Sequence, residues 1–270
     1  MELFRHEIIS DRIIRIINFL GNCCYLVIGE EKACLLDTLD GFGNLEEYAR
    51  KFTDKPIFVI LTHAHLDHCG GCFFFEEVYM NHKDLDLFNT MSPVDYRLNA
   101  NRGNPEVAKL PISELNPSFE GHIINVDDGD VFDLGNVSIK MIAVKGHTQG
   151  TMIPLIVEER AAVFGDACGV GTLILEYSAT IEEYRKSLIN FKQHEDSYDL
   201  ILRNHGTFTS PKELLDNVIE CCDIILEGNR EFDKVSSHGH DFLVTMPMDD
   251  KGNRVDGKQG NIKFLADKIR

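Results

Sequence analysis

Three histidines and one aspartate lie within six consecutive positions in the first quarter of the chain. The segment reads Thr62-His63-Ala64-His65-Leu66-Asp67-His68. Imidazole and carboxylate groups are the ligands that borderline divalent metals such as zinc prefer. Crowded imidazoles with a carboxylate among them have little structural use unless an ion binds them together. We therefore interpret the segment as a metal-binding motif, and not as a chance cluster among the eleven histidines of the chain.

Three further candidate ligands lie downstream, each at the end of an apolar segment. His147 follows a segment that ends at Val144, Asp166 follows Val163-Phe164, and His205 follows a segment that ends at Leu202. Each candidate has a glycine as a direct neighbour, which gives the backbone room to approach an ion. Together with the first cluster they provide enough ligands for more than one metal.

The elements that must position these side chains are short strands separated by turns. The apolar run 57–61 is typical of a fully buried strand, and it ends directly before the histidine cluster. Further strands are predicted at 12–19, 24–28, 33–37, 78–80, 123–126, 131–132, 137–144, 152–157, 161–164 and 198–202. Helices are predicted at 44–49 with Asn44 as cap, at 73–75, at 82–89, at 180–191 and at 211–227. The pattern Thr180-Ile181-Glu182-Glu183 is a capping box.

Residues 91–120 differ from the rest of the chain in composition. Four prolines and four asparagines interrupt this segment, which predicts irregular structure. Long irregular segments inside a domain are commonly lids or binding loops. We therefore expect this segment to select the substrate. The three phenylalanines at 73–75 are expected in the core.

Composition restricts the classes of partner. The 27 basic and 44 acidic residues give a net charge of −17, so we expect no nucleic-acid partner. No apolar stretch approaches the ~20 residues of a membrane span, and no signal peptide is visible, so no membrane association is expected. The eight cysteines are interpreted as reduced thiols of a cytoplasmic protein. The sequence carries no indication of an oligomeric state.

The ordered motifs resemble those of the metallo-β-lactamase superfamily of metal-dependent hydrolases, over nearly the entire chain to about Phe208. The resemblance implies an α/β fold, a four-layer αβ/βα sandwich with a two-metal site at one edge of the sheets. We expect a single such domain over 1–270, with 91–120 as a lid insertion and 236–270 as a C-terminal extension. Leu36-Asp37-Thr38 also fits the family, whereas Leu39-Asp40-Gly41 and Gln149 depart from its common pattern.

The resemblance assigns each candidate residue a role. One metal would be held by His63, His65 and His147, the second by Asp67, His68 and His205, with Asp166 bridging the two. The expected ions are two divalent metals, zinc first, with iron or manganese as alternatives. Neutral imidazoles leave an ion's charge largely uncancelled, so a bound water is acidified toward a pKa of about 7. Attack by metal-bound hydroxide would cleave a small ester, thioester, lactone or phosphoester, with Asp67 as the catalytic residue that positions the water and passes its proton to the leaving group.

Asp166 also indicates which branches of the family the chain resembles. The β-lactamases with a thiolate ligand carry cysteine at this position, so β-lactamase activity is not expected. An aspartate here resembles the glyoxalase-II-like, lactonase and phosphodiesterase branches. The flavodiiron branch replaces the second histidine of the motif by glutamate, whereas this chain has His65.

Two further motifs each allow more than one interpretation. Cys69-Gly70-Gly71-Cys72 is a C-x-x-C motif directly behind the cluster, which fits a redox pair but better fits two small buried residues. His238-Gly239-His240 in the tail could approach the metal site, although a surface turn is the simpler interpretation. Lys145, Tyr177 and Asn204 are candidates for substrate contact by neighbourhood alone.

Two other function classes fit part of this pattern. An iron-dependent redox protein such as a sulfur dioxygenase would use one iron and dispense with second-site ligands, whereas His68 and His205 keep that second site available. A non-catalytic metal-binding module would have closed coordination, whereas seven ligands for two ions leave positions open for water and substrate. The expected function is therefore a metal-dependent hydrolase of a small molecule.

Overall fold

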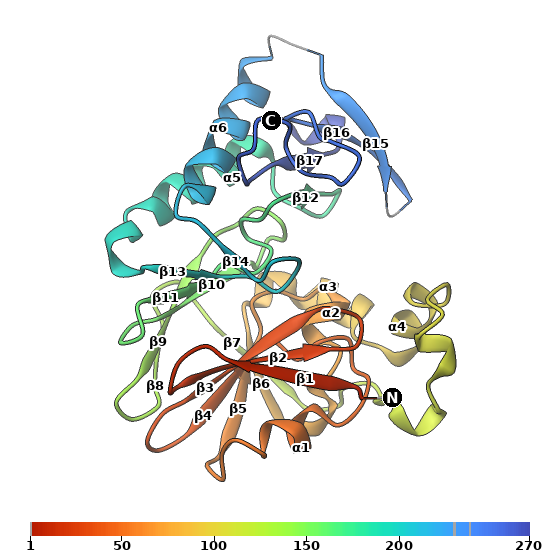
Figure 1. The fold of residues 1–270 in the computed structure, drawn as a ribbon, viewed down its shortest axis with the longest axis vertical. Helices are drawn as coiled ribbons and strands as arrows, with labels where there is room; N and C mark the ends of the chain where they lie inside the picture. The colour runs from red at the N-terminus through yellow and green to blue at the C-terminus, as the bar shows by residue number, and fades with distance from the viewer. Residues whose placement is uncertain (1, 229–230, 238) are drawn as a thin grey trace.

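The computed structural model describes residues 2–228, 231–237 and 239–270. Its first sheet has seven strands that lie side by side in chain order (Figure 1). They are β1 Phe4–Ile8, β2 Ile13–Asn18, β3 Cys23–Ile28, β4 Ala33–Leu36, β5 Ile57–Ile60, β6 Glu77–Met80 and β7 His122–Asn125. Neighbours from β1 to β4 are antiparallel, and those from β4 to β7 are parallel.

The second sheet has six strands in the order β14-β13-β11-β10-β9-β8. They are β8 Val131–Asp133, β9 Ser138–Ala143, β10 Met152–Ile156, β11 Ala161–Val163, β13 Leu200–Leu202 and β14 Thr209–Ser210. The hairpin of β10 and β11 is antiparallel, as predicted, and β13 runs parallel to β11.

The central strands of both sheets are buried on their two faces, which places a helix layer outside each sheet. In β4, Leu35 packs on the helix side while Leu36 packs between the sheets, because successive strand residues point to opposite faces. The helices on the first sheet are α1 Leu45–Ala49, α2 Leu66–Cys69 and α3 Leu85–Met91, and those on the second are α5 Ile181–Lys192 and α6 Leu214–Glu227 (Figure 1). The predicted four-layer αβ/βα sandwich is thereby confirmed.

Two predicted helix starts are present with their capping bonds. Asn44 Oδ1 accepts a hydrogen bond from the Glu47 amide at 3.0 Å, and it caps α1. At α5 the capping box forms in full, because Thr180 accepts from the Glu183 amide while the Glu183 carboxylate accepts from the Thr180 amide. Each bond satisfies an amide that the first helical turn would otherwise leave unpaired.

A third sheet was absent from the sequence-based prediction. It has the order β12-β17-β16-β15, with β12 Thr172–Ile174, β15 Asp233–Ser237, β16 His240–Val244 and β17 Ile262–Phe264. Because β17 pairs in parallel with β12, the C-terminal segment is tied to a loop of the second half. Ile262 and Phe264 also pack in the same apolar cluster as α5 and α6.

The segment 91–120 is more regular than its prolines suggested. It contains the helix α4 Val94–Ala100 and two short 3-10 turns, at Val107–Lys109 and Ile112–Glu114. The prediction of irregular structure throughout was wrong, because Pro93 and Pro111 stand at helix starts, where a missing amide hydrogen costs nothing. Arg97 of α4 is buried and anchors the segment by donating to the carbonyl oxygens of Asp40 and Gly41.

The three phenylalanines at 73–75 are only partly core residues. Phe75 is buried, whereas Phe73 is 42% exposed, because the 3-10 helix Cys72–Phe74 has room for only one face against the sheet. All eight cysteines are free thiols and buried, as the interpretation of reduced cysteines predicts. In the part of the chain that the structure describes, every helix is too short or too polar to cross a bilayer.

Candidate metal centre

The seven predicted site residues converge at one edge of the two sheets. His63 and His65 follow β5, while Asp67 and His68 lie in the short helix α2. The other three lie in loops that follow strands of the second sheet. These are His147 after β9, Asp166 after β11 and His205 after β13. Residues up to 142 positions apart in the chain therefore meet at one place, because these strands end at the same edge.

The first group is formed by three imidazoles. His65 Nδ1 lies 3.0 Å from His63 Nε2 and 2.9 Å from His147 Nε2. One nitrogen from each ring thus faces a common centre, and the three atoms lie close enough to bind a single ion. This is the set that the sequence-based prediction assigned to the first metal.

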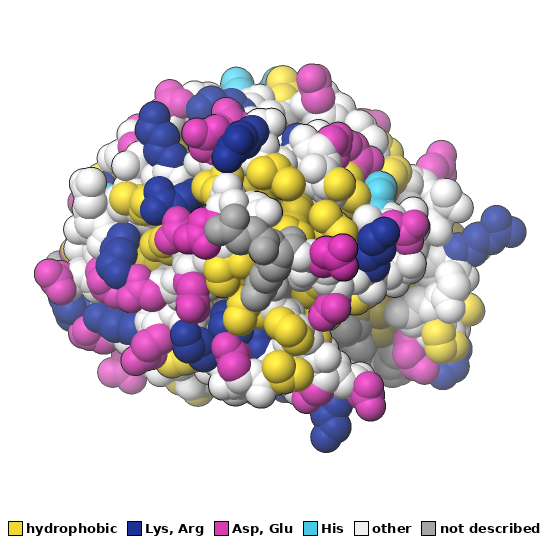
Figure 2. All heavy atoms as spheres, turned by 90° about the horizontal axis from the view of Figure 1, so that it is seen from above, with side chains coloured by type: hydrophobic (Ala, Val, Ile, Leu, Met, Phe, Trp, Pro, Cys, Tyr) yellow, Lys and Arg dark blue, Asp and Glu magenta, His cyan; other side chains and the backbone are white. Residues whose placement is uncertain are grey.

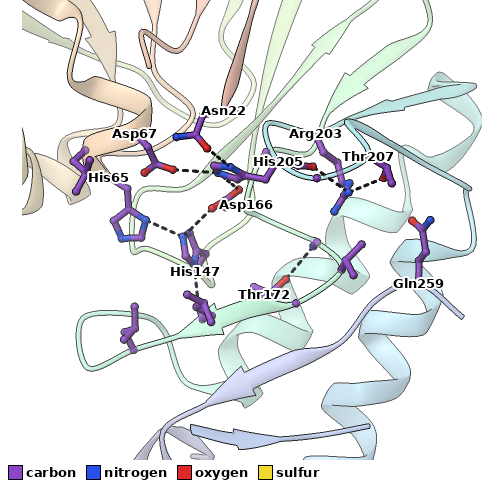
Figure 3. Close-up of a pocket in the computed structure, with 18 of the residues that line it drawn as sticks. Asn22, His65, Asp67, His147, Asp166, Thr172, Arg203, His205, Thr207 and Gln259 are labelled. Carbon is purple, nitrogen blue, oxygen red and sulfur yellow. Dashed lines mark hydrogen bonds and ion pairs between the residues drawn. The ribbon is translucent and has the colours of Figure 1, made fainter. Parts of the chain in front are cut away.

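The second group contains Asp67, His68 and His205. His205 Nε2 lies 3.2 Å from Asp67 Oδ2 and 3.3 Å from His68 Nε2. Asp166 lies between the two groups, with Oδ1 3.4 Å from His205 Nε2 and Oδ2 3.6 Å from His147 Nε2 (Figure 3). This position is the one expected of a carboxylate that bridges two ions.

Each of the five histidines also has a partner at its outer ring nitrogen. The pairs are His63 Nδ1 with Thr62 Oγ1 at 3.0 Å, His65 Nε2 with Tyr177 Oη at 2.9 Å, His68 Nδ1 with Asp37 Oδ2 at 2.8 Å, His147 Nδ1 with the Leu173 carbonyl at 2.7 Å, and His205 Nδ1 with Asn22 Oδ1 at 2.9 Å. An outer partner fixes the ring and directs the lone pair of the inner nitrogen to the centre. The donor set therefore fits divalent metals of the zinc type.

The protonation states of His63, His65 and the two carboxylates agree with that fit. Burial lowers the pKa of His65 to about 3 and, together with the nearby His68, moves the pKa of His63 well below its usual range. Burial alone would raise the pKa of Asp67 and Asp166, but the charges of His68 and His205 outweigh it and lower both. Neutral imidazoles and ionised carboxylates are the forms that bind metal.

His68 depends on a buried carboxylate beneath the site. Burial opposes its protonation, but the charges of Asp37, Asp67 and Asp166 and the hydrogen bond to Asp37 together outweigh this effect and raise the pKa of His68 to about 9. Asp37 also accepts hydrogen bonds from the Thr62 amide at 2.7 Å and from Asn204 Nδ2 at 2.9 Å. The Asp37 backbone has φ +70°, an uncommon conformation for a residue with a side chain. Its carboxylate thus binds three segments of the site, at Thr62, His68 and Asn204.

His205 is supported by a polar pair that sequence reasoning missed. Asn22 Nδ2 donates to Asp40 Oδ2 at 2.9 Å while its Oδ1 faces His205. Asp40 lies in Leu39-Asp40-Gly41, one of the two places where the sequence departs from the common family pattern, and it is buried. Burial and the nearby Asp67 raise the pKa of Asp40 to about 6. The departure therefore has a structural consequence, because it supplies the anchor for Asn22.

Asp84 joins the two loops that carry the first group. Its Oδ1 accepts from the Gly150 amide at 2.7 Å, and its Oδ2 accepts from Thr148 Oγ1 at 2.6 Å and from the Ala64 amide at 3.3 Å. Asp84 is buried, and it lies outside the ligand set. Nothing in the sequence around Asp84 distinguishes it from other aspartates.

A cavity of about 1240 Å³ opens over the centre (Figure 3). Five of the predicted ligands line it: His65, Asp67, His147, Asp166 and His205. Its walls come from the loops 165–177 and 203–207 and from two more distant parts of the chain, the segment 91–120 and the segment 240–259. Tyr177 and His240 also line the cavity, so a simple surface turn was too cautious an interpretation for His240, whereas His238 lies outside the described residues.

The other two residues predicted as candidates for substrate contact, Lys145 and Asn204, are not among the residues that line the cavity. Lys145 forms an ion pair with Glu183 at 2.7 Å, and Asn204 is bound to Asp37 below the site. Burial raises the pKa of Cys72 to about 12 and moves that of Cys69 well above its usual range. Since a thiolate is the reactive form of cysteine, the pair has the properties of buried structural thiols.

Residues 18–198 match the family model described as the metallo-beta-lactamase superfamily. The chain belongs to this superfamily. The resemblance in the motifs is thereby confirmed. Among solved structures, the metallo-beta-lactamase from Pontibacter korlensis superposes with a TM-score of 0.61 at 14% identity, over 82% of this chain and 99% of that one. This likeness supports the shared sandwich fold.

Two curated relatives of the chain are named as a thioesterase and as a hydrolase. The acyl-coenzyme A thioesterase MBLAC2 of Bos taurus is 28% identical over 184 residues, which cover 57% of this chain and 61% of that protein. The hydroxyacylglutathione hydrolase GloC of Haemophilus influenzae is 25% identical over 214 residues, covering 73% of this chain and 91% of that protein. The match to the first relative therefore spans about three fifths of its length.

Proposed function

We propose that this chain is a zinc-dependent hydrolase of thioesters with two metals in its site. The observation that carries the proposal is the convergence of five imidazoles and two carboxylates at the floor of a large cavity, with every outer imidazole nitrogen held by a partner. Imidazole and carboxylate donors suit zinc, and seven ligands for two ions leave positions for water and substrate. The thioester class is supported by the two named relatives.

The proposed roles follow the two groups. His63, His65 and His147 would hold one ion, and Asp67, His68 and His205 the other, with Asp166 shared between them. When bound, the two ions supply an acidified water and polarise the carbonyl of the substrate. Hydrolysis joins the water oxygen to the acyl carbon and breaks the carbon–sulfur bond, and the thiol leaves with a proton.

Asp67 is proposed to hold and move that proton. Its Oδ2 lies 3.2 Å from His205 Nε2 and 3.7 Å from His68 Nε2, and its side chain lines the cavity. The neighbouring histidines lower the pKa of Asp67 against the effect of burial, so its carboxylate is ionised, which is the form that can take up a proton. Tyr177 Oη, on the far side of His65, is placed to contact the substrate from the cavity wall.

A small molecule, and not a nucleic acid, is the proposed substrate. Acidic and basic side chains are interspersed on the face made by α6 and the third sheet (Figure 2), and the net charge of the chain is −17. Phosphate backbones bind to contiguous basic surfaces. The eight buried free thiols suit a reducing compartment, for which we propose the cytoplasm.

The proposal is tested by a hydrolysis screen with the purified, metal-loaded chain. Acetyl-coenzyme A and S-lactoylglutathione represent thioesters, and a lactone and a phosphodiester serve as alternatives. We expect thiol release from a thioester with kcat/KM at least about a hundredfold higher than hydrolysis of the other classes, a difference within the range of enzymatic discrimination. Efficient turnover of the phosphodiester or the lactone alone would contradict the thioester assignment.

Asp166→Ala tests the site within the same screen. Loss of the shared carboxylate is expected to lower kcat/KM by at least about a hundredfold, as removal of groups at a reacting centre does. Asp54→Ala, an exposed carboxylate outside the cavity, is the matched control and is expected to keep full activity. Circular dichroism checks the fold of both variants, and full activity of a folded Asp166→Ala would overturn the assignment.

A further inference from the structure

One buried arginine in the cavity wall has unused hydrogen-bond donors. Arg203 is 6% exposed, and its Nη2 donates to the His205 carbonyl at 3.1 Å and to Thr207 Oγ1 at 2.9 Å. Within the described residues, its buried Nε has no partner, and no hydrogen bond from its Nη1 is formed. A guanidinium has five N–H groups, so three of them are left without a protein acceptor.

The other buried arginines differ from Arg203, because protein groups accept their hydrogen bonds or pair with their charge. Arg97 donates through Nε, Nη1 and Nη2 to the carbonyl oxygens of Ser92, Asp40, Gly41, Asn116 and Pro117. Arg254 binds the Asp256 carboxylate with Nε and Nη2 and the Gly260 carbonyl with Nη1. Arg15 forms an ion pair with Glu7 at 2.5 Å. Each uses its charge or its donors on the protein, and Arg203 departs from this pattern.

Arg203 is also without a carboxylate at ion-pair distance among the described residues. The nearest acidic influence on it is Asp166, whose oxygens face the metal-site histidines. A buried charge is costly unless it is paired, so an arginine left in this state in a cavity wall is matched to a ligand. Guanidinium groups bind carboxylates and phosphates in particular, because their forked donors fit two oxygens.

The surroundings of Arg203 complete a polar subsite beside the metal centre. Thr207, Lys258 and Gln259 line the same cavity, and the amide of Gln259 points toward Arg203 and Thr207 (Figure 3). An oxyanion would accept from Nε2 of Gln259, because the Oε1 atom, which is buried and without a partner in the described part of the chain, is itself an acceptor. Lys258 and Gln259 belong to the C-terminal segment, whereas Arg203 directly precedes the loop of His205. The subsite thus spans the boundary between the sandwich and its C-terminal segment.

We propose that Arg203, together with the amide of Gln259, binds an oxyanion on the substrate, at a point away from the bond that is cut. The inference rests on the proposed function for the position of the reacting bond, and it adds the requirement that the substrate be anionic. The oxyanion is a phosphate, as in coenzyme A, or a carboxylate, as in glutathione. The C-terminal segment thereby takes part in substrate selection along with 91–120.

The test measures binding of uncleavable thioethers to the metal-loaded chain by calorimetry. S-Ethyl coenzyme A carries phosphates, S-ethyl glutathione carries carboxylates, and S-ethyl N-acetylcysteamine is neutral. We expect one anionic thioether to bind at least about tenfold more tightly than the neutral one, because hydrogen bonds to charged groups are the stronger kind. The anionic thioether that binds more tightly identifies the source of the oxyanion. Equal binding of all three would overturn the proposal.

The variant Arg203→Gln keeps two amide donors and removes the charge. It is expected to reduce the preference for the anionic thioether by about tenfold. Arg160→Gln, which removes an exposed arginine paired with Asp199, is expected to leave the preference unchanged. An unchanged preference in a folded Arg203→Gln would contradict the proposal. If this variant does not fold, Gln259→Leu decides the question, with an expected loss of about threefold or more in the preference for the anionic thioether.

Binding of thioethers requires no hydrolysis, so the two proposals can fail separately. Tight, Arg203-dependent binding without turnover of any thioester would contradict the proposed function and leave the anion subsite in place. Thioester turnover without a preference for anionic ligands would support the proposed function and contradict the anion subsite.

Discussion

At the scale of single residues, the ligand types were predictable and their supporting partners were not. The cluster at 63–68 stands out because four ligating side chains occupy six positions. Asn22 and Asp84 carry no such signal, since each is a single polar residue in an ordinary segment, and Asp37 was noted only as part of the family motif Leu36-Asp37-Thr38, without a role. Asn22, for example, contacts His205 across 183 positions. Only the fold brings such pairs together.

Asp84 provides a prediction at this scale. Asp84→Ala removes the acceptor for three donors in the loops of His65 and His147, and buried donors without partners are costly. We expect the free energy of unfolding to fall by about 2 kcal/mol or more. Zinc affinity should fall by about ten- to hundredfold, the range for partners behind metal ligands. Chemical denaturation and zinc titration measure the two effects.

The matched control for this variant is Asp86→Ala, which removes an exposed carboxylate two residues away on α3. It should change the stability only slightly and leave zinc affinity unaltered. A native-like zinc affinity in Asp84→Ala would mean that the two ligand loops hold their positions without the carboxylate.

At the scale of elements, strands with long apolar runs and helices with capping patterns were predictable. The strands of the third sheet were not, because β12 and β17 have three residues each and pair across about 90 positions. The helix α4 was also missed, since the prolines that precede helices resemble those that end them. Both missed regions line the cavity, through Tyr96 of α4 and through His240 and Gln259 in or next to the third sheet.

The segment 91–120 is predicted to affect substrate range more than metal content. Its Met91, Tyr96 and Ala100 line the cavity, but none belongs to the candidate metal ligands. Tyr96→Ala is the mild form of the test, and replacement of 91–120 by a short linker is the severe form. We expect Tyr96→Ala to change KM by about threefold or more between short and long acyl thioesters, by loss of apolar contact.

Kinetics over an acyl series, combined with elemental analysis, checks this prediction. The linker variant should also lose some stability, since Arg97 anchors the loop of Asp40 and Gly41. Loss of metal from Tyr96→Ala would indicate that the segment supports the metal centre and does not serve as a lid.

At the scale of the whole molecule, the order of elements and the ordered motifs were sufficient to predict the sandwich. Two strand-rich halves with helices outside them leave few other arrangements, and the metal ligands fall at strand ends, where such folds place their sites. The sequence indicated that the C-terminal segment approaches the site only as an open alternative, for His238-Gly239-His240. The position of this segment depends on the long-range pairing of short strands such as β12 and β17, and it brings His240 and Gln259 into the lining of the cavity.

The central claim is that two divalent ions occupy the centre and enable hydrolysis. The most direct measurement is elemental analysis of the chain purified without added metal, together with thioester turnover before and after a chelator. The account predicts close to two ions per chain, zinc foremost, with activity lost on chelation and restored by zinc. A single tightly bound iron, or turnover that persists in the metal-free chain, would contradict it.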